Sequence, residues 1–174
     1  MVTESMALGI VLERREIDHP WESHSWTAVS VIPGAAEGDE WRVLAEEPGV
    51  VRYHAGTLTL EIHHKETEGY RLNLTTERPK VYIVLRYDDE IETGIVPFLV
   101  TVCPYEAQNY LDGDEDLVEP APMPDVVAAW LTDFVARHHV DEPFYKRQRK
   151  PYDPRKGPPE RPRRAGLRGD DGAH

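Results

Sequence analysis

Residues 57–102 constrain the fold most, because they contain three apolar runs separated by short polar turns. Apolar and polar side chains alternate over residues 57–65, and they alternate again over residues 70–76, after a turn at residues 66–69. Successive side chains of an extended chain point to opposite faces, so this alternation predicts two half-buried strands in an antiparallel hairpin. Residues 81–85 are apolar at every position, which predicts a strand covered on both faces.

Further strands are expected on both sides of this segment. Residues 6–13, 26–33, 41–45 and 50–54 are short apolar segments, and a turn at Ala55 and Gly56 leads the last of them into the hairpin. Residues 94–102 form the last long strand, in which Pro97 predicts an edge position or a bulge, because proline cannot donate to the ladder. Six or more strands predict a mainly β (α+β) fold, an antiparallel β-barrel or sandwich.

Two helices are expected after the strands. Pro104 stands at the first position of residues 104–111, which is typical of a short helix start. Residues 124–139 place Val127, Leu131 and Phe134 at three- and four-residue spacing, which predicts one C-terminal helix that caps the sheet. We therefore expect a β-rich globular domain over residues 1–140, followed by an extended, basic, proline-rich tail over residues 141–174.

Charge divides the chain in the same way. Residues 146–168 contain ten lysines and arginines but only two carboxylates, so their net charge is +8. Because the net charge of the whole chain is −12, the remaining residues carry −20. An acidic body with a basic segment is typical of a protein that meets an acidic partner, with an attraction that weakens as salt rises. The acidic body would repel nucleic acid, so a protein partner is favoured over a nucleic acid.

Composition also restricts the class of protein. The 174 residues are enough for one hydrophobic core, and the single cysteine, Cys103, excludes an intramolecular disulfide. No run of about 20 apolar residues is present, so membrane insertion is not expected. The first residues contain neither a basic segment nor an apolar one, so a cytoplasmic location is the expectation.

No catalytic motif is visible in the sequence. There is no Gly-x-Ser-x-Gly elbow, glycine-rich phosphate loop or His-Glu-x-x-His. Cys103 has no histidine or basic neighbour in sequence, which is typical of a small buried hydrophobe. His63 and His64 are adjacent in an expected strand, so their imidazoles should point to opposite faces and not share a metal. We therefore expect neither enzymatic activity nor a resident metal or cofactor.

Aromatic and basic residues are the candidates for binding a partner. Arg14 and Arg15 lead directly into a loop that contains Trp21 and Trp26, so cationic and aromatic groups are expected to form one patch, and this composition is typical of interface anchors. The alternative is that each tryptophan closes the end of the sheet. In the tail, aromatic residues precede a dense basic run, and the candidates there are Phe144, Tyr145, Lys146, Arg147, Arg149, Lys150, Arg155 and Lys156.

Several short motifs between residues 7 and 150 carry a resemblance. They are Val11-x-x-Arg14-Arg15, Pro20-Trp21 with Trp26, Pro104-Tyr105-Glu106-Ala107, Phe134-Val135-x-x-His138 and Phe144-x-Lys146-Arg147-x-Arg149. Together they resemble an uncharacterised family of small cytoplasmic bacterial proteins. Members of that family are encoded beside molybdenum-dependent formate dehydrogenases and genes for molybdopterin-guanine dinucleotide maturation.

The resemblance implies a function in the company of a molybdenum enzyme. We expect a non-catalytic accessory or maturation protein, or a small extra subunit, that binds the molybdenum-containing catalytic subunit of a formate dehydrogenase. One alternative is a cofactor-handling protein that holds molybdopterin or a guanine nucleotide beside Arg14, His24 and Trp26, although residues 8–15 contain no glycine-rich phosphate loop. The other is a nucleic-acid-binding module that uses the basic tail.

Overall fold

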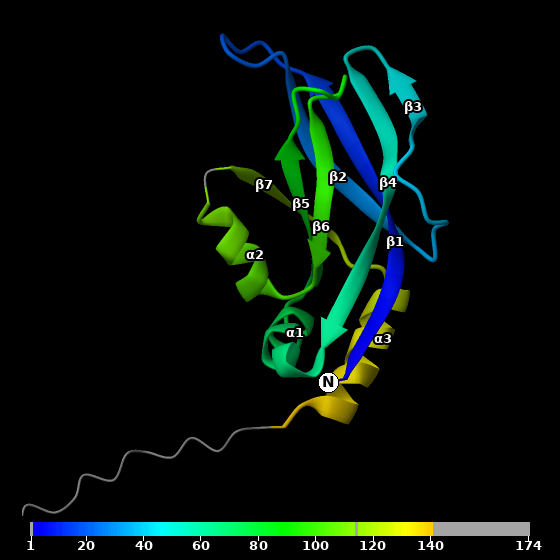
Figure 1. Cartoon of the computed structure of the whole chain (residues 1–174), viewed down its shortest axis with the longest axis vertical. Coiled ribbons are helices and arrows are strands. Elements are labelled where there is room, and N and C mark those ends of the chain that lie inside the picture. Colours follow the sequence, from blue (N-terminus) through cyan, green and yellow to red (C-terminus); the bar gives the residue numbers. More distant parts are fainter. Residues whose placement is uncertain (1, 114, 141–174) are drawn as a thin grey trace, which may run out of the picture. The chain divides into compact units, whose positions relative to one another are not determined.

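Four antiparallel strands form the larger of two sheets, which we call sheet A (Figure 1). They are β1 (Thr3–Glu16), β2 (His24–Pro33), β3 (Trp41–Glu47) and β4 (Val50–His63), in the order β2-β1-β4-β3. The computed structural model describes residues 2–113 and 115–140. The segment expected to form the basic tail, residues 141–174, lies outside the described residues.

Three more strands form sheet B, in the order β6-β5-β7. β5 (Lys80–Tyr87) pairs antiparallel with β6 (Ile95–Thr101) on one side and with β7 (Asp116–Pro122) on the other. Val81, Ile83, Val84 and Leu85 of β5 are all buried, so the expected strand with two covered faces is confirmed. Pro97 lies on the edge strand β6, beside a bulge at which the register with β5 shifts, as its chemistry requires.

The hydrophobic core lies between the two sheets. Leu8, Ile10 and Leu12 of β1 project from the inner face of sheet A and are fully buried in one cluster with the β5 side chains. Each such side chain contributes about 1.5–3 kcal/mol by leaving water. β4 lies against β6, and β2 lies against β7. The mainly β class is confirmed, and the two separate sheets fit a sandwich, because the described residues form no closed barrel.

Three helices cover sheet B and one end of the sandwich (Figure 1). They are α1 (Thr67–Leu74), which follows a 3₁₀ turn at His64–Glu66, α2 (Pro104–Leu111) and α3 (Asp125–His138). α2 and α3 occupy the two segments where helices were expected. Val127, Leu131 and Phe134 of α3 are fully buried, so the expected capping helix is confirmed.

The hairpin expected from residues 57–76 is wrong, because residues 67–74 form helix α1. Alternating Tyr70, Leu72 and Leu74 resemble a strand in sequence, but Leu72 is exposed, and the buried side chains are Tyr70 and Asn73. The Asn73 amide donates to the carbonyl oxygens of Lys80 (2.7 Å) and Val102 (2.9 Å) and accepts from the Lys80 N–H (3.0 Å). This side chain joins α1 to sheet B as a strand pairing would have done.

Two further expectations about sheet A and β7 need correction. The turn expected at Ala55 and Gly56 is a bulge within the single long strand β4, where Gly56 has a φ of +90°. A Cβ at Gly56 would lie 3.1 Å from Asp39 Cα, so both the conformation and the space require glycine. A strand over residues 116–122 was not among those expected; β7 is an edge strand, a position that accommodates Pro120 and Pro122.

Candidate functional site

Arg14 and Arg15 project from opposite faces at the end of β1. Arg14 is paired in register with Trp26 of β2 and lies on the inner face, two residues beyond Leu12. Its guanidinium carbon is 5.9 Å from the Trp26 ring and 5.6 Å from the Tyr53 ring, within the range of cation–π attraction. Arg15 lies on the outer face. The two arginines therefore do not form the single patch that their adjacency suggested.

Trp26 belongs to a cluster of three aromatic rings on the inner face of sheet A. Its ring centroid is 5.8 Å from that of Trp41 and 5.7 Å from that of Tyr53, and the last two are 5.5 Å apart. These distances suit edge-to-face packing, which contributes about 0.5–1.5 kcal/mol per pair beyond burial. Trp26 and Trp41 also pack against the core. Trp26 thus closes the end of the sandwich, while all three rings remain partly exposed.

Glu13 is a buried carboxylate on the outer face beside Arg15. It accepts from Arg52 at 2.9 Å and from Arg15 at 2.7 Å, and its own residue is only 7% exposed. Hydrogen bonds from Arg52 and then Arg15 lower the pKa of Glu13 below its ordinary value. Arg15 therefore has a structural contact, and 60% of its side chain remains exposed for a partner.

Trp21 projects from the loop between β1 and β2. The loop is closed by a hydrogen bond from the Ile17 N–H to the Ser23 carbonyl (3.0 Å), and the Trp21 N–H donates to His19 Nδ1 (3.3 Å). The indole is 81% exposed, the largest exposed fraction among the large hydrophobic side chains of the described chain. The only ring contact found for it among those residues is with His19, at 6.0 Å between centroids.

A groove of about 370 Å³ lies beside this end of β1, with Arg14 on its lining. Glu16, Glu46 and Glu47 line the same groove, so three carboxylates surround one guanidinium. His24, the third residue expected to hold a pterin or nucleotide, interacts through Nδ1 with the Ser23 hydroxyl (2.9 Å). A nucleotide carries several negative charges on its phosphates, and the three carboxylates would repel all of them, so this groove is poorly suited to a nucleotide.

A second pocket, of about 250 Å³, lies between α1 and α2. Glu66, Cys103 and Glu106 line it, and Glu106 accepts from the Thr101 hydroxyl at 3.0 Å. Burial raises the pKa of Glu106, and burial also raises the pKa of the Cys103 thiol. A thiol with a raised pKa is a poor nucleophile. The expectation that Cys103 behaves as a small buried side chain agrees with this environment.

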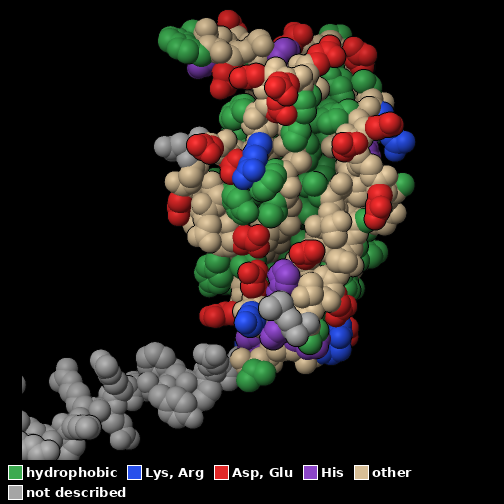
Figure 2. Space-filling model, in the orientation of Figure 1, with side chains coloured by type: hydrophobic (Ala, Val, Ile, Leu, Met, Phe, Trp, Pro, Cys, Tyr) green, Lys and Arg blue, Asp and Glu red, His purple; other side chains and the backbone are tan. Residues whose placement is uncertain are grey.

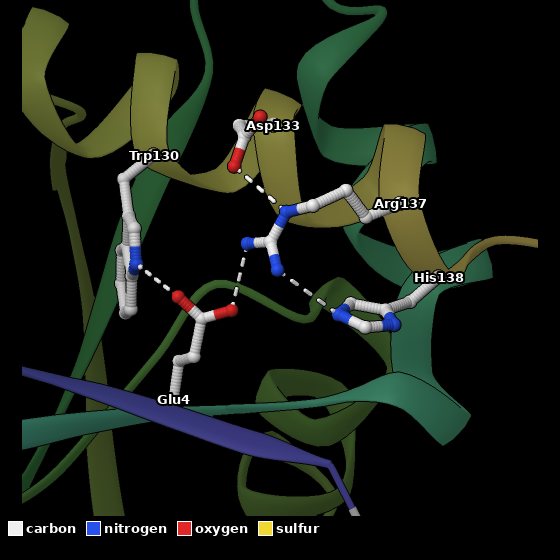
Figure 3. A network of polar contacts seen from close by, with 5 residues as sticks. All are labelled: Glu4, Trp130, Asp133, Arg137 and His138. Carbon is white, nitrogen blue, oxygen red and sulfur yellow. Dashed lines mark hydrogen bonds and ion pairs between the residues drawn. The ribbon is translucent and has the colours of Figure 1, made fainter.

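A polar network fixes α3 to the start of β1 (Figure 3). Glu4 accepts from the Trp130 indole N–H at 3.2 Å and from Arg137 Nη2 at 2.8 Å, and Arg137 also donates to Asp133 at 2.9 Å. The hydrogen bond from Arg137 lowers the pKa of Glu4. His138 completes the network, with its Nε2 3.3 Å from Arg137 Nη1. The network is structural, because each charge already has a partner within it.

The structure thus brings Arg14 and Trp26 together, and it separates Arg15 onto the other face and Trp21 onto a loop. Sequence reasoning missed Trp41 and Tyr53, which complete the aromatic cluster; the signal was their position on the inner face of paired strands. The remaining candidates lie outside the described residues, and they are Phe144, Tyr145, Lys146, Arg147, Arg149, Lys150, Arg155 and Lys156.

Residues 2–113 and 115–140 contain neither a metal-binding cluster nor a membrane-spanning helix. No group of three or more histidine, cysteine or acidic side chains is arranged to hold a metal ion there. No helix in this part of the chain has the length and apolar character needed to cross a membrane. Figure 2 shows carboxylates spread over one face of the domain, with few lysine or arginine side chains between them.

Comparisons with known proteins give one match. Residues 7–149 match the model of a family described as "Protein of unknown function (DUF3305)". No curated protein and no solved structure matches the chain. The matched region includes both sheets, all three helices and every candidate residue from Arg14 to Arg149.

Proposed function

Since the chain belongs to this DUF3305 family, whose function is unknown, we propose that it is a non-catalytic accessory protein that binds a larger protein. The proposed docking surface consists of the Trp21 loop and the aromatic cluster on the inner face of sheet A, and Arg15 is a further candidate contact on the outer face of the same end. The single observation that carries the proposal is the 81% exposed Trp21 indole on a loop closed by its own hydrogen bonds. An indole this exposed offers a large apolar area that a partner can cover.

The physical chemistry of interfaces supports this surface. Tryptophan and arginine are enriched among the few residues that supply most of the binding free energy of an interface. The backbone of the Trp21 loop is closed by the Ile17–Ser23 hydrogen bond before binding, so less backbone entropy is lost when the loop docks. Arg15, at the same end of β1, offers a guanidinium that is 60% exposed and already oriented by Glu13. An exposed indole and an oriented cation at the same end of the sheet are suitable anchors for a protein surface.

The proposed partner is the molybdenum-containing catalytic subunit of a formate dehydrogenase, in the cytoplasm. This part of the proposal rests on the family resemblance and on the acidic body with its basic residues 146–168. The chain would act either as a maturation factor that visits the apo-enzyme or as a stable extra subunit. Copurification distinguishes these roles, because a subunit remains stoichiometric with active enzyme and a maturation factor does not.

Affinity capture from the native host with a Trp21→Ala variant tests the docking surface. Loss of a hot-spot tryptophan should weaken capture of the dehydrogenase by at least about 30-fold, equivalent to about 2 kcal/mol. Tyr105→Ala is the matched control, because Tyr105 is another exposed aromatic side chain but lies on α2. Equal capture by all three proteins would refute the Trp21 surface, and capture of no dehydrogenase by the unaltered chain would refute the partner.

A further inference from the structure

A pocket on the outer face of sheet A adjoins the proposed docking surface at Trp41. It is lined by Ile32 of β2, the loop of residues 35–40, Trp41 and Arg42 of β3, and His54 and Thr57 of β4, and its volume is about 650 Å³. This volume lies within the range of about 300–1,000 Å³ that is usual for small-molecule sites. Its lining combines apolar and charged side chains, so a ligand with one apolar part and one charged group would fit.

Gly9 of β1 lies beneath three of the side chains that line this pocket. A Cβ built at Gly9 would lie 2.7 Å from His54 Nε2, 3.0 Å from Ala35 Cβ and 3.4 Å from Ile32 Cβ. The His54 imidazole therefore lies directly over the Gly9 backbone, next to the loop. Any larger residue at position 9 would displace this ring, so glycine here keeps the histidine close to the strand.

The loop that forms one wall is held by three hydrogen bonds. The Thr57 N–H donates to the Gly38 carbonyl at 2.8 Å, and the Thr57 hydroxyl donates to the Ala36 carbonyl at 2.7 Å. At the start of the loop, the Gly34 N–H donates to the Ala7 carbonyl at 2.8 Å. The wall is thus fixed to β1 and β4 without a ligand, and a fixed pocket loses little entropy on binding.

Arg42 and His54 are the charged and polar groups on the strand side of the pocket. They are directly opposite in the β3–β4 register, so both side chains project from the outer face next to each other. Across residues 2–113 and 115–140, no hydrogen bond, ion pair or ring contact is recorded for either side chain. Arg15, Arg52, Arg86 and Arg137, by contrast, each bind a carboxylate.

We propose that this pocket binds a small organic monocarboxylate through the Arg42 guanidinium and the His54 imidazole. A guanidinium presents two parallel N–H groups that match the two oxygens of a carboxylate. The apolar part of the ligand lies against Ile32, which is 42% exposed without one, and Ala35. The inference is independent of the proposed docking function.

The acidic rim selects among anions. Glu37, Asp39 and Glu40 are exposed residues of the same lining, and their negative charges repel an incoming anion. A dianion such as phosphate is repelled about twice as strongly as a monoanion and gains no apolar contact. The pocket should therefore accept a monocarboxylate with a hydrophobic group and reject inorganic phosphate.

Backbone amide chemical shifts of the full-length, ¹⁵N-labelled chain test the proposal, with benzoate, acetate and phosphate added separately at constant ionic strength. We expect saturable shifts at Gly38, Arg42 and His54 with benzoate, weaker binding of acetate because it lacks the apolar ring, and no saturation with phosphate. Arg42→Gln should weaken benzoate binding by at least about tenfold, since a charge-assisted hydrogen bond is lost.

Arg78→Gln is the matched control, because it removes the same charge from an exposed residue outside the pocket and should leave binding unchanged. Amide dispersion verifies that both variants are folded. The proposal is overturned if benzoate gives no saturable shift, if Arg42→Gln and the unaltered chain bind it equally, or if phosphate saturates the same amides as tightly as benzoate does.

Discussion

The two ends of sheet A differ in how their apolar surface is covered. Where β1 begins, α3 covers the core with its fully buried Phe134, and Arg137 of the helix binds Glu4 of the strand. Where β1 ends, none of the described helices covers the inner face, and Trp26 remains partly exposed in the aromatic cluster. The described chain thus covers its core at the first end and leaves part of the aromatic cluster exposed at the second, where we propose that another molecule binds. Stability and recognition are therefore expected to depend on different ends of one sheet.

Phe134→Ala tests this division with the largest expected effect. Removal of a fully buried ring leaves a cavity beneath α3, so the free energy of unfolding should fall by about 3–5 kcal/mol. Trp21→Ala at the other end should change it by less than about 0.5 kcal/mol, because the ring is exposed. Urea unfolding followed by circular dichroism measures both values. Similar losses for the two variants would remove the distinction between the ends.

Glu13→Gln measures how much one ion-paired carboxylate contributes to the free energy of unfolding, at the end of sheet A that carries Arg15. Replacing the charge weakens the bonds from Arg52 and Arg15, so we expect a loss of about 1 kcal/mol at pH 7. Because the pKa of Glu13 is lowered by folding, this contribution is present above the ordinary glutamate value near 4.5 and disappears as the pH falls below it. Urea unfolding at several pH values gives the slope. Glu37→Gln, an exposed carboxylate, should change nothing, and a loss equal to that of Glu13→Gln would contradict the expectation.

Glu106→Gln should have a smaller effect of opposite sign at the helix-covered end. Burial raises the pKa of Glu106, so its charged form costs stability above the ordinary glutamate value, and the cost disappears as the pH falls. The neutral amide should raise the free energy of unfolding by less than about 1 kcal/mol at pH 7 and flatten its dependence on pH between about 4.5 and 7. The same unfolding series detects this change. A loss of stability at pH 7 would show that the charged carboxylate is favourable there.

The sequence predicts those elements in which apolar side chains follow one regular pattern over the whole length of the element. Residues 81–85 are apolar throughout, and the structure covers β5 on both faces. The spacing of Val127, Leu131 and Phe134 is helical, and all three are buried beneath α3. The loop that carries Trp21 was also expected, because Pro20 disfavours helix in this segment, although Trp26, placed in the same loop, belongs to β2.

The sequence fails where a single side chain or a bulge decides the outcome. Apolar and polar residues alternate over residues 70–76, which is the pattern of a strand. The pattern does not show that the Asn73 side-chain amide will make three hydrogen bonds that attach this segment to sheet B as a helix. The aromatic cluster depends on three strands in register, and extra residues in β2, β3 and β4 shift that register. Bulges leave little trace in composition. The meeting of Trp26, Trp41 and Tyr53 is therefore visible only in three dimensions.

The close contact between Gly69 and Cys103 has a practical consequence. Cys103 Sγ lies 2.6 Å from the point where a Cβ of residue 69 would be, and the residue is 4% exposed. As the only cysteine of the chain, it should react slowly with maleimide or with a spin label. A cysteine introduced at position 21 or 32 would then carry a fluorophore or a nitroxide alone, and the native protein would need no prior removal of thiols.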